Sequence, residues 1–198
     1  MTAVAALGFQ SCTDWDDHYD VTTDGSGVSD QTLWEQISNN PKLSNFAALM
    51  KKVGYDKALS TNQSYTVWAP SNDAFDFEKY NAMSDSLLKA EFLNNHIARG
   101  YHRATGEINE RVHLLNKKVM AFQGNGRYTL GNIAIDSTNM LGKNGIIHLM
   151  SSYMDFRPNF YEEFLRNENT TSLAQLYKSA MKREIDKENS IEGPIKDG

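Results

Sequence analysis

Hydrophobic residues in the first part of the chain recur at helical spacing. Leu33, Trp34 and Ile37 fall on one side of a helix that begins after a predicted N-cap at Ser29-Asp30. Asn39-Asn40-Pro41 ends this helix, because proline lacks the backbone N–H that a helix interior needs. The pattern therefore predicts a short amphipathic helix at the start of the folded part.

The same spacing predicts two more helices. One covers residues 43–53 and stops at Gly54, because glycine readily adopts the left-handed conformation found just after helix ends. The other is longer and covers residues 84–97. Its predicted inward positions are Leu87, Leu88, Phe92 and Leu93.

β-Branched and aromatic residues indicate the strands. Residues 64–68 predict a strand that Ala69-Pro70 ends, and Ser71-Asn72-Asp73 then caps a helical turn carrying Phe75. Helices that precede most of the strands indicate an α+β fold rather than a doubly wound α/β sheet. The later strands are predicted at residues 118–123, 127–130, 132–135 and 145–150, with a hairpin turn at Gly124-Asn125-Gly126.

Composition excludes several classes of protein. The chain has 198 residues, of which 40% are apolar, and a net charge of −5. These values do not fit a wholly disordered chain, a collagen-like chain or a polytopic membrane protein. The lack of a basic excess argues against a nucleic-acid binder. A single cysteine excludes a disulfide framework and a cysteine-based zinc finger.

The negative charge lies in the N-terminal arm. Residues 1–41 contain seven acidic residues and no lysine or arginine, whereas residues 42–198 carry a net charge of +2. Residues 13–30 include Gly25-Ser26-Gly27, and we expect them to form an acidic, flexible linker.

The segment before this linker resembles the end of a bacterial lipoprotein signal. Residues 1–12 are mostly apolar, too short to span a bilayer, and end at Cys12, directly after the small Ser11. We expect a signal-peptide remnant with Cys12 as the lipidated residue. The acidic stretch from Asp14 to Asp17 resembles a signal that sends lipoproteins to the outer surface of Gram-negative bacteria. The alternative is a free cysteine in a frayed terminus.

Three segments, in order, resemble the motifs of a fasciclin domain. The first, Thr66-Val67-Trp68-Ala69-Pro70-Ser71-Asn72-Asp73-Ala74-Phe75, is similar to the family's TVFAPTNEAF. The second, Leu93-Asn94-Asn95-His96-Ile97, is similar to its tyrosine–histidine motif. The third, Asn144-Gly145-Ile146-Ile147-His148-Leu149, is similar to NGVIHVID. The resemblance covers residues 31–157 and implies a wedge-shaped β-sandwich with helices packed around it.

The motif residues are expected to be structural. They are Thr66, Ala69, Pro70, Asn72, Phe75, His96, Asn144, Gly145 and His148. Asn144-Gly145 predicts a tight turn that leads into a buried strand. Asn95 and Ser151 depart from the family's tyrosine and aspartate, so the integrin binding linked to some animal members is not carried over to this chain.

His96 and His148 lie on otherwise apolar elements. We expect core histidines bonded to nearby polar groups. A metal pair with His102 and His113 is the alternative, but no two histidines have a helical i, i+4 spacing. We therefore expect no metal and no other cofactor.

No catalytic group is expected either. Ser71, Asp73 and His96 are the residue types of a hydrolase, but Ser71 is not in a GxSxG turn. Capping of the following helical turn explains Ser71 better. The chain is therefore predicted not to be an enzyme.

The C-terminal segment repeats the first helices. Residues 33–37 match residues 160–164, and residues 46–49 match residues 173–176, both at an offset of 127 without a gap; Lys51 and Lys178 obey the same offset. This predicts that residues 158–198 are the incomplete start of a second fasciclin repeat. The alternative is a chance likeness of two amphipathic helix pairs.

These observations predict a non-enzymatic binding protein at the cell surface. The resemblance implies adhesion or capture of an extracellular glycan or protein by a lipid-anchored protein of the Gram-negative outer membrane, without nucleic acid as partner. Glycan capture is the favoured variant, and a groove lined by Trp or Tyr would support it. The alternative is a structural spacer in an outer-membrane assembly such as a glycan-import complex, which a flat apolar patch would support.

Overall fold

The computed structural model describes residues 29–166 together with residues 172, 175, 176 and 179. The chain divides into two units, Met1–Phe156 and Arg157–Gly198, and each is described by itself. The predicted leader with Cys12, and the linker up to residue 28, lie outside the described residues. Within the described part, no helix combines the length and the apolar character that a membrane crossing requires.

Short helical elements open the first unit, and most of its strands follow them. The α-helices are α1 (Leu33–Asn39), α2 (Ser44–Lys52), α3 (Tyr55–Ala58), α4 (Phe77–Asn81) and α5 (Asp85–Leu87). Single turns of other helix types are the 3₁₀ elements η1 (Pro41–Leu43), η2 (Asn72–Ala74) and η4 (Leu93–Asn95) and the π-helical η3 (Leu88–Phe92). The strands are β1 (Tyr65–Pro70), β2 (Ile97–Arg99), β3 (Glu107–His113), β4 (Val119–Asn125), β5 (Arg127–Leu130), β6 (Ile133–Ala134), β7 (Ser137–Gly142) and β8 (Gly145–Met150).

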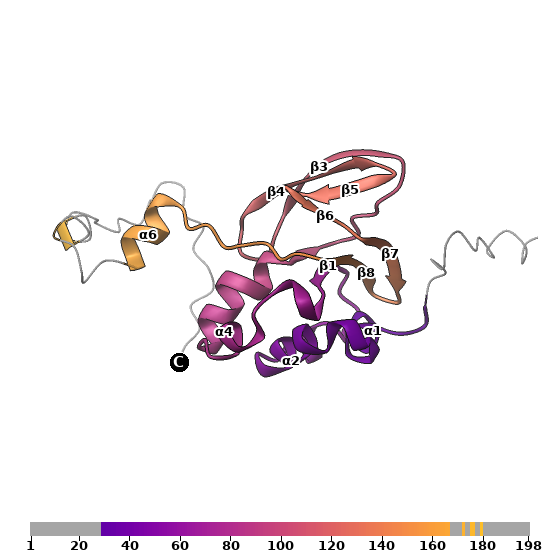
Figure 1. Ribbon diagram of the computed structural model, residues 1–198, viewed down its shortest axis with the longest axis horizontal. Helices are drawn as coiled ribbons and strands as arrows, with labels where there is room; N and C mark the ends of the chain where they lie inside the picture. The colour runs from indigo at the N-terminus through magenta and orange to yellow at the C-terminus, as the bar shows by residue number, and fades with distance from the viewer. Residues whose placement is uncertain (1–28, 167–171, 173–174, 177–178, 180–198) are drawn as a thin grey trace, which may run out of the picture. The chain divides into compact units, whose positions relative to one another are not determined.

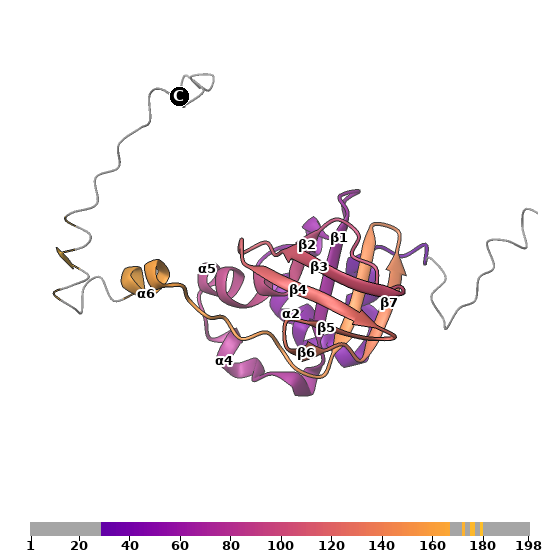
Figure 2. The ribbon, with the colours of Figure 1, turned by 90° about the horizontal axis from the view of Figure 1, so that it is seen from above.

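The strands form two four-stranded sheets. The first has the order β2-β1-β8-β7 and the second the order β3-β4-β5-β6. The β1–β8 pair is parallel, and the other neighbours are antiparallel. The helices cover one face of the first sheet, and the second sheet lies over its other face (Figures 1 and 2). The predicted α+β class with stacked sheets is confirmed.

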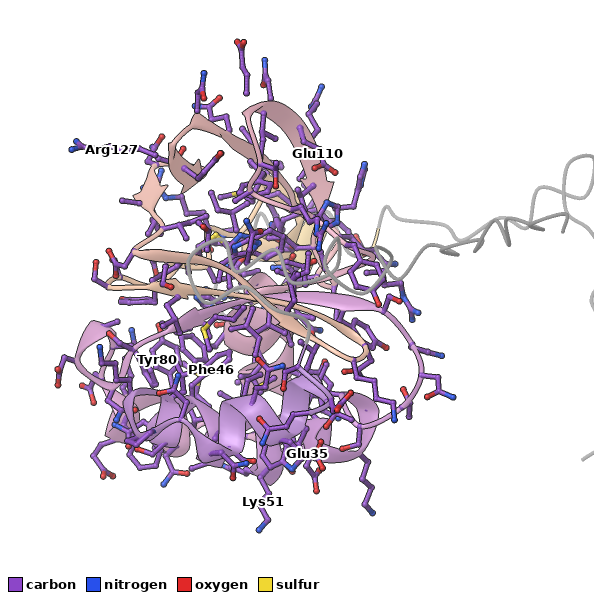
Figure 3. All side chains as sticks on the ribbon, turned by 90° about the vertical axis from the view of Figure 1, so that its right-hand side faces the viewer. Glu35, Phe46, Lys51, Tyr80, Glu110 and Arg127 are labelled. Atoms are coloured by element: carbon purple, nitrogen blue, oxygen red, sulfur yellow. The ribbon has the colours of Figure 1, made fainter. Side chains whose placement is uncertain are left out.

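Two hydrophobic clusters hold these layers together. Successive side chains of a strand point to opposite faces, so β1 contributes to both clusters. Val67 and Ala69 join the cluster between the first sheet and the helices, which includes Phe46 and Tyr80 (Figure 3). Trp68 joins the cluster between the two sheets and is fully buried.

The first helix begins later than its sequence pattern predicted. Its N-cap is Thr32, not Ser29-Asp30. The Thr32 hydroxyl accepts a hydrogen bond from the Glu35 N–H, and the Glu35 carboxylate accepts one from the Thr32 N–H at 2.7 Å. This reciprocal capping box satisfies two backbone donors at once, which a cap at Ser29 would not do.

The helix predicted over residues 84–97 exists but is irregular, because residues 85–95 are helical in three different types, and it ends earlier than predicted. The segment is divided into α5, η3 and η4, and Ile97 begins β2, where it pairs with Val67. Leu88, Phe92 and Leu93 are fully buried, but Leu87 is 49% exposed. Leu87 is therefore not an inward position, and the pairing of Ile97 with the central strand overrides helical propensity at the end of the segment.

Candidate functional site

The first and third motifs lie side by side in the first sheet. They form β1 and β8, in register from Tyr65 opposite Gly145 to Pro70 opposite Met150. A Cβ atom added at Gly145 would lie 2.0 Å from the Tyr65 carbonyl oxygen and 2.6 Å from Leu33 Cδ1. Only glycine therefore allows the two strands and α1 to approach each other this closely at this point.

Asn144 connects three parts of the first unit. Its side chain is buried, and its Oδ1 atom accepts a hydrogen bond from the Leu33 N–H of α1 at 2.8 Å. Its Nδ2 atom donates to the carbonyl oxygens of Leu59 and Thr61, at 2.8 Å and 2.7 Å. The side chain thus has a structural role, because it satisfies three buried or partly buried backbone groups.

His148 and Thr66 fix the loop that leads from the first sheet to the second. The His148 ring accepts a hydrogen bond from the Asn139 N–H at Nδ1, so Nε2 carries the proton and donates to the His102 carbonyl oxygen at 2.9 Å. The Thr66 hydroxyl donates to the Gly100 carbonyl oxygen and accepts from the His102 N–H. Burial lowers the pKa of His148 to about 4, so the ring is neutral at pH 7.

His96 likewise binds main-chain groups, and it joins the segment before β2 to the end of the first unit. Its Nδ1 donates to the Phe92 carbonyl oxygen at 2.8 Å, and its Nε2 accepts from the Met154 N–H at 3.0 Å. The neighbouring Asn95, where the family has tyrosine, donates from Nδ2 to the Met154 carbonyl oxygen. Burial lowers the pKa of His96 to about 4. Both ring nitrogens of His96 and of His148 thus face main-chain groups.

This arrangement does not favour a histidine metal site. A ligating nitrogen needs a free lone pair, and the acceptor nitrogen of each buried ring already takes a backbone N–H. His102 contacts His148 only with its backbone carbonyl oxygen. The Nδ1 atom of its ring lies 2.6 Å from the Glu110 carboxylate. In the described ranges, no group of three or more His, Cys, Asp or Glu side chains is placed to hold a metal ion.

Trp68 belongs to the core rather than to a binding surface. Its ring stacks on His148 with a centroid distance of 5.6 Å and meets the edge of Phe122 at 5.7 Å. The indole is fully buried, and its Nε1 atom has no hydrogen-bond partner in the part of the chain that the structure describes. Packing between the sheets therefore holds this side chain in place.

An open groove lies where the first motif ends. Its volume is about 570 Å³. One wall comes from η1 and η2, and the other from the start of β7 and the end of β8. The lining residues are Pro41, Lys42, Ser71, Asn72, Asp73, Asp136, Ser137, Leu149 and Met150.

Asn72 holds the first wall of the groove in place. Its Oδ1 accepts a hydrogen bond from the Asn45 N–H at 3.0 Å, and its Nδ2 donates to the Pro41 carbonyl oxygen at 2.8 Å. It therefore joins η1 and α2 to η2 instead of capping its own turn. Ser71 is the N-cap of η2 by position, but its side chain makes no capping hydrogen bond, so the predicted capping by side chains here is wrong.

The charged groups of the groove are Lys42, Asp73 and Asp136, which are all exposed. Asp136 accepts a hydrogen bond from the Ser151 hydroxyl, which orients this carboxylate. The pattern of the sequence did not reveal the groove, because Asp136 lies 63 positions after Asp73 and outside the predicted strands. The only signal was the polar run Ser71-Asn72-Asp73 directly after a buried strand.

The groove can bind a ligand by hydrogen bonds and charge. None of its lining residues is a histidine or a cysteine, and none is Trp or Tyr. His96 does not line it, because this side chain is fully buried. The geometry therefore does not bring Ser71, Asp73 and His96 together as a hydrolase would require.

The fasciclin-domain family model matches residues 41–155. The chain therefore belongs to the fasciclin domain family, whose members often serve in cell adhesion or binding and are typically not enzymes. This establishes the family that the three motifs suggested.

Two similar proteins put this membership in context. Protein sll1483 of Synechocystis sp. (strain ATCC 27184 / PCC 6803 / Kazusa) is 26% identical over 143 residues, which cover 65% of this chain and 79% of that protein. A FAS1 domain pair from the insect cell adhesion molecule fasciclin I is 15% identical, with a TM-score of 0.47. That match covers 65% of this chain and 52% of the pair, so this chain spans about half of that structure.

Proposed function

We propose that this fasciclin domain is a non-enzymatic binding domain of the cell surface, which holds a polar segment of an extracellular ligand in the groove beside η2. The observation that carries the proposal is the position of the groove at the end of the first family motif. The buried strand β1 ends at Pro70, directly before Ser71, and the Ser71 N–H donates to the carbonyl oxygen of Met150 at the end of β8 at 2.9 Å. The strand pair at the centre of the fold therefore holds the start of this groove wall in place. A preformed polar groove lowers the entropy cost of binding.

The lining favours a protein segment over a glycan as ligand. Sugar rings stack on aromatic side chains, and the lining contains no aromatic residue. Trp34 is half-buried and Trp68 is fully buried in the cores. Two carboxylates against one lysine favour a basic side chain on the ligand, which would pair with Asp73 or Asp136.

Replacing both groove carboxylates is expected to weaken ligand binding. The double variant Asp73→Asn and Asp136→Asn should lower the affinity for a captured protein at least 10-fold, because about 1.4 kcal/mol of charge-assisted hydrogen bonding corresponds to that factor. Binding of the full chain to an array of extracellular proteins and glycans identifies the ligand. Surface plasmon resonance then compares the variants with the original protein.

The matched control is Glu78→Gln on α4, which also removes an exposed carboxylate but does not line the groove. It should bind like the original protein. Equal binding by the Asp73 and Asp136 variant would contradict the groove as the site. Absence of binding to every array member would favour the structural-spacer function, and affinity purification from the outer membrane would then be the test.

We also propose that a lipid on Cys12 anchors the domain at the outer membrane. The sequence supports this with an apolar segment that ends at the single cysteine and an acidic stretch that follows it. The long acidic linker would then separate the domain from the membrane surface.

The variant Cys12→Ser is expected to move the protein from the membrane to the aqueous fraction, because it removes the thiol that carries the lipid. Detergent phase partitioning of cells that express the complete native gene measures this, and intact mass spectrometry shows the lipid. Ser26→Ala in the linker is the control and should stay in the detergent phase. A Cys12→Ser protein that also stays there would show that another segment holds the membrane.

A further inference from the structure

The second sheet has an edge strand with an unpaired outer side. β3 (Glu107–His113) is the end strand in the order β3-β4-β5-β6, so it pairs with β4 on one side only (Figure 2). Directly after β3, Leu114 forms an isolated bridge with Ala98 of β2. Before that bridge, from Glu107 to Arg111, no strand of the described part of the chain pairs with the other side of β3.

Two hydrogen bonds show which main-chain groups point to this free side. The Leu114 N–H donates to the Lys118 carbonyl oxygen at 2.9 Å, so Leu114 faces β4, as does every second residue before it. The Ala121 carbonyl oxygen accepts from the Gly131 N–H at 2.7 Å, so Ala121 faces β5, and its partner Arg111 faces away from β4. The outward main-chain groups therefore belong to residues 107, 109 and 111.

The side chains of these three residues lie on the exposed face of the second sheet. Glu107, Asn109 and Arg111 are exposed, and they alternate with the half-buried Ile108 and Glu110. In the described ranges, neither Glu107 nor Arg111 makes an ion pair. About 13 Å of strand separates these two residues, so they do not reach each other within one chain.

We propose that β3 pairs with the β3 strand of a second copy of this chain, antiparallel and with Asn109 at the centre. A two-fold axis at Asn109 places Glu107 of each copy opposite Arg111 of the other, on the same face of the sheet. Both ends of the pair then carry an ion pair. The two four-stranded sheets become one continuous sheet. None of the residues that line the groove lies in β3, so this pairing does not depend on the proposed function.

The centre at Asn109 uses the free edge completely. Every outward residue of one copy, at positions 107, 109 and 111, meets an outward residue of the other. A centre at Arg111 would place arginine opposite arginine. A centre at Glu110 would place Glu107 opposite His113, beside which β2 already lies. The charges and the length of the free edge therefore favour the same register, and this self-complementarity is what assigns the edge to a second copy.

Sedimentation equilibrium of the full chain tests the pair. Five residues from each copy form a small interface, so we expect a dimer with a Kd of about 0.1–1 mM. The variant Asn109→Pro should be monomeric, because proline removes the central outward N–H. An edge strand tolerates proline at such a position, and circular dichroism checks that the variant is folded. An original chain that stays monomeric up to about 1 mM overturns the proposal.

Exchange of the two charges tests the register. Glu107→Arg and Arg111→Glu should each self-associate at least about 10-fold more weakly than the original chain, because each places like charges opposite each other at both ends. An equimolar mixture of the two variants should restore the dimer, because every arginine at these positions then meets a glutamate. The double variant should also dimerise. A mixture that associates no better than either variant alone overturns the antiparallel register.

Two controls separate this pair from other kinds of association. Arg127→Glu makes the same change in charge on the exposed face of β5, which is not the edge strand, and should leave the Kd unchanged. Phe160→Ser removes a side chain that is 73% exposed on α6 (Phe160–Arg166) and should also leave it unchanged. A dimer that is lost with Phe160→Ser but kept with Asn109→Pro would form through another surface and would overturn the proposal.

Discussion

Replacing Gly145 by alanine is expected to lower the free energy of unfolding of the first unit by more than about 3 kcal/mol, or to prevent folding. The added Cβ would lie 2.0 Å from the Tyr65 carbonyl oxygen. This oxygen belongs to the backbone of the paired strand, so it cannot rotate away as the end of a side chain can. The two strands would have to separate where Tyr65 pairs with Gly145, and Leu33 of α1 would lose its contact with Gly145. Urea unfolding followed by circular dichroism measures the loss.

The matched control for this substitution is Gly106→Ala. Gly106 has a φ of +63°, and no atom lies within 4 Å of an added Cβ. Its replacement should cost only the left-handed backbone strain, about 1–2 kcal/mol. If Gly145→Ala lowers the free energy of unfolding by no more than Gly106→Ala does, the close approach of the two strands is not what requires glycine at position 145.

Acid is expected to destabilise the first unit well above the pH at which carboxylates become protonated. Burial lowers the pKa values of His96 and His148 to about 4, from an ordinary value of 6.5. Between pH 6.5 and pH 4 the unfolded chain therefore binds up to two more protons than the folded one. Stability is highest above pH 6.5 and falls as the pH drops toward 4, by on the order of 3 kcal/mol for each ring.

Urea unfolding at pH 7.5, 6.0 and 5.0 measures this pH dependence. The variant His148→Gln should keep about half of it, because one of the two titrating rings is gone. The control His113→Gln, at an exposed position of β3, should keep all of it. A free energy of unfolding that is constant from pH 7.5 to pH 5.0 would show that folding does not lower the pKa values of the two rings.

The sequence predicted best the elements whose hydrophobic pattern is local. The β4–β5 hairpin was predicted from alternating residues around Gly124-Asn125-Gly126, and the strand formed by residues 145–150 from its apolar run. It missed β2, which has three residues, and two longer strands that are rich in polar residues. These are β3, with the sequence EINERVH, and β7, which contains a register shift between Ser137 and Met140. Such strands are formed by pairing with their neighbours rather than by their own propensity.

In the candidate site, too, the features with a local sequence pattern could be predicted and those that depend on tertiary contacts could not. The motif residues were predicted to be structural, and the structure shows which main-chain groups two of them bind: Thr66 and His148 bond to the loop between the two sheets. The groove depends on Asp136 and Ser137, which reach Asp73 only because β7 and β8 return to the central strand. No local pattern contains that information, since it arises from tertiary contacts across more than sixty residues.

The parallel pairing of β1 with β8 also sets the order in which the protein can form. Tyr65 pairs with Gly145, so the central contact joins residues 80 positions apart. Closing so long a loop costs entropy before any contact repays it, and such topologies fold slowly. On the ribosome, the helices of the first unit emerge long before β8, and their core stays incomplete until residue 150 is free. The unit is therefore expected to fold late and as a whole, after nearly all of it has been synthesised.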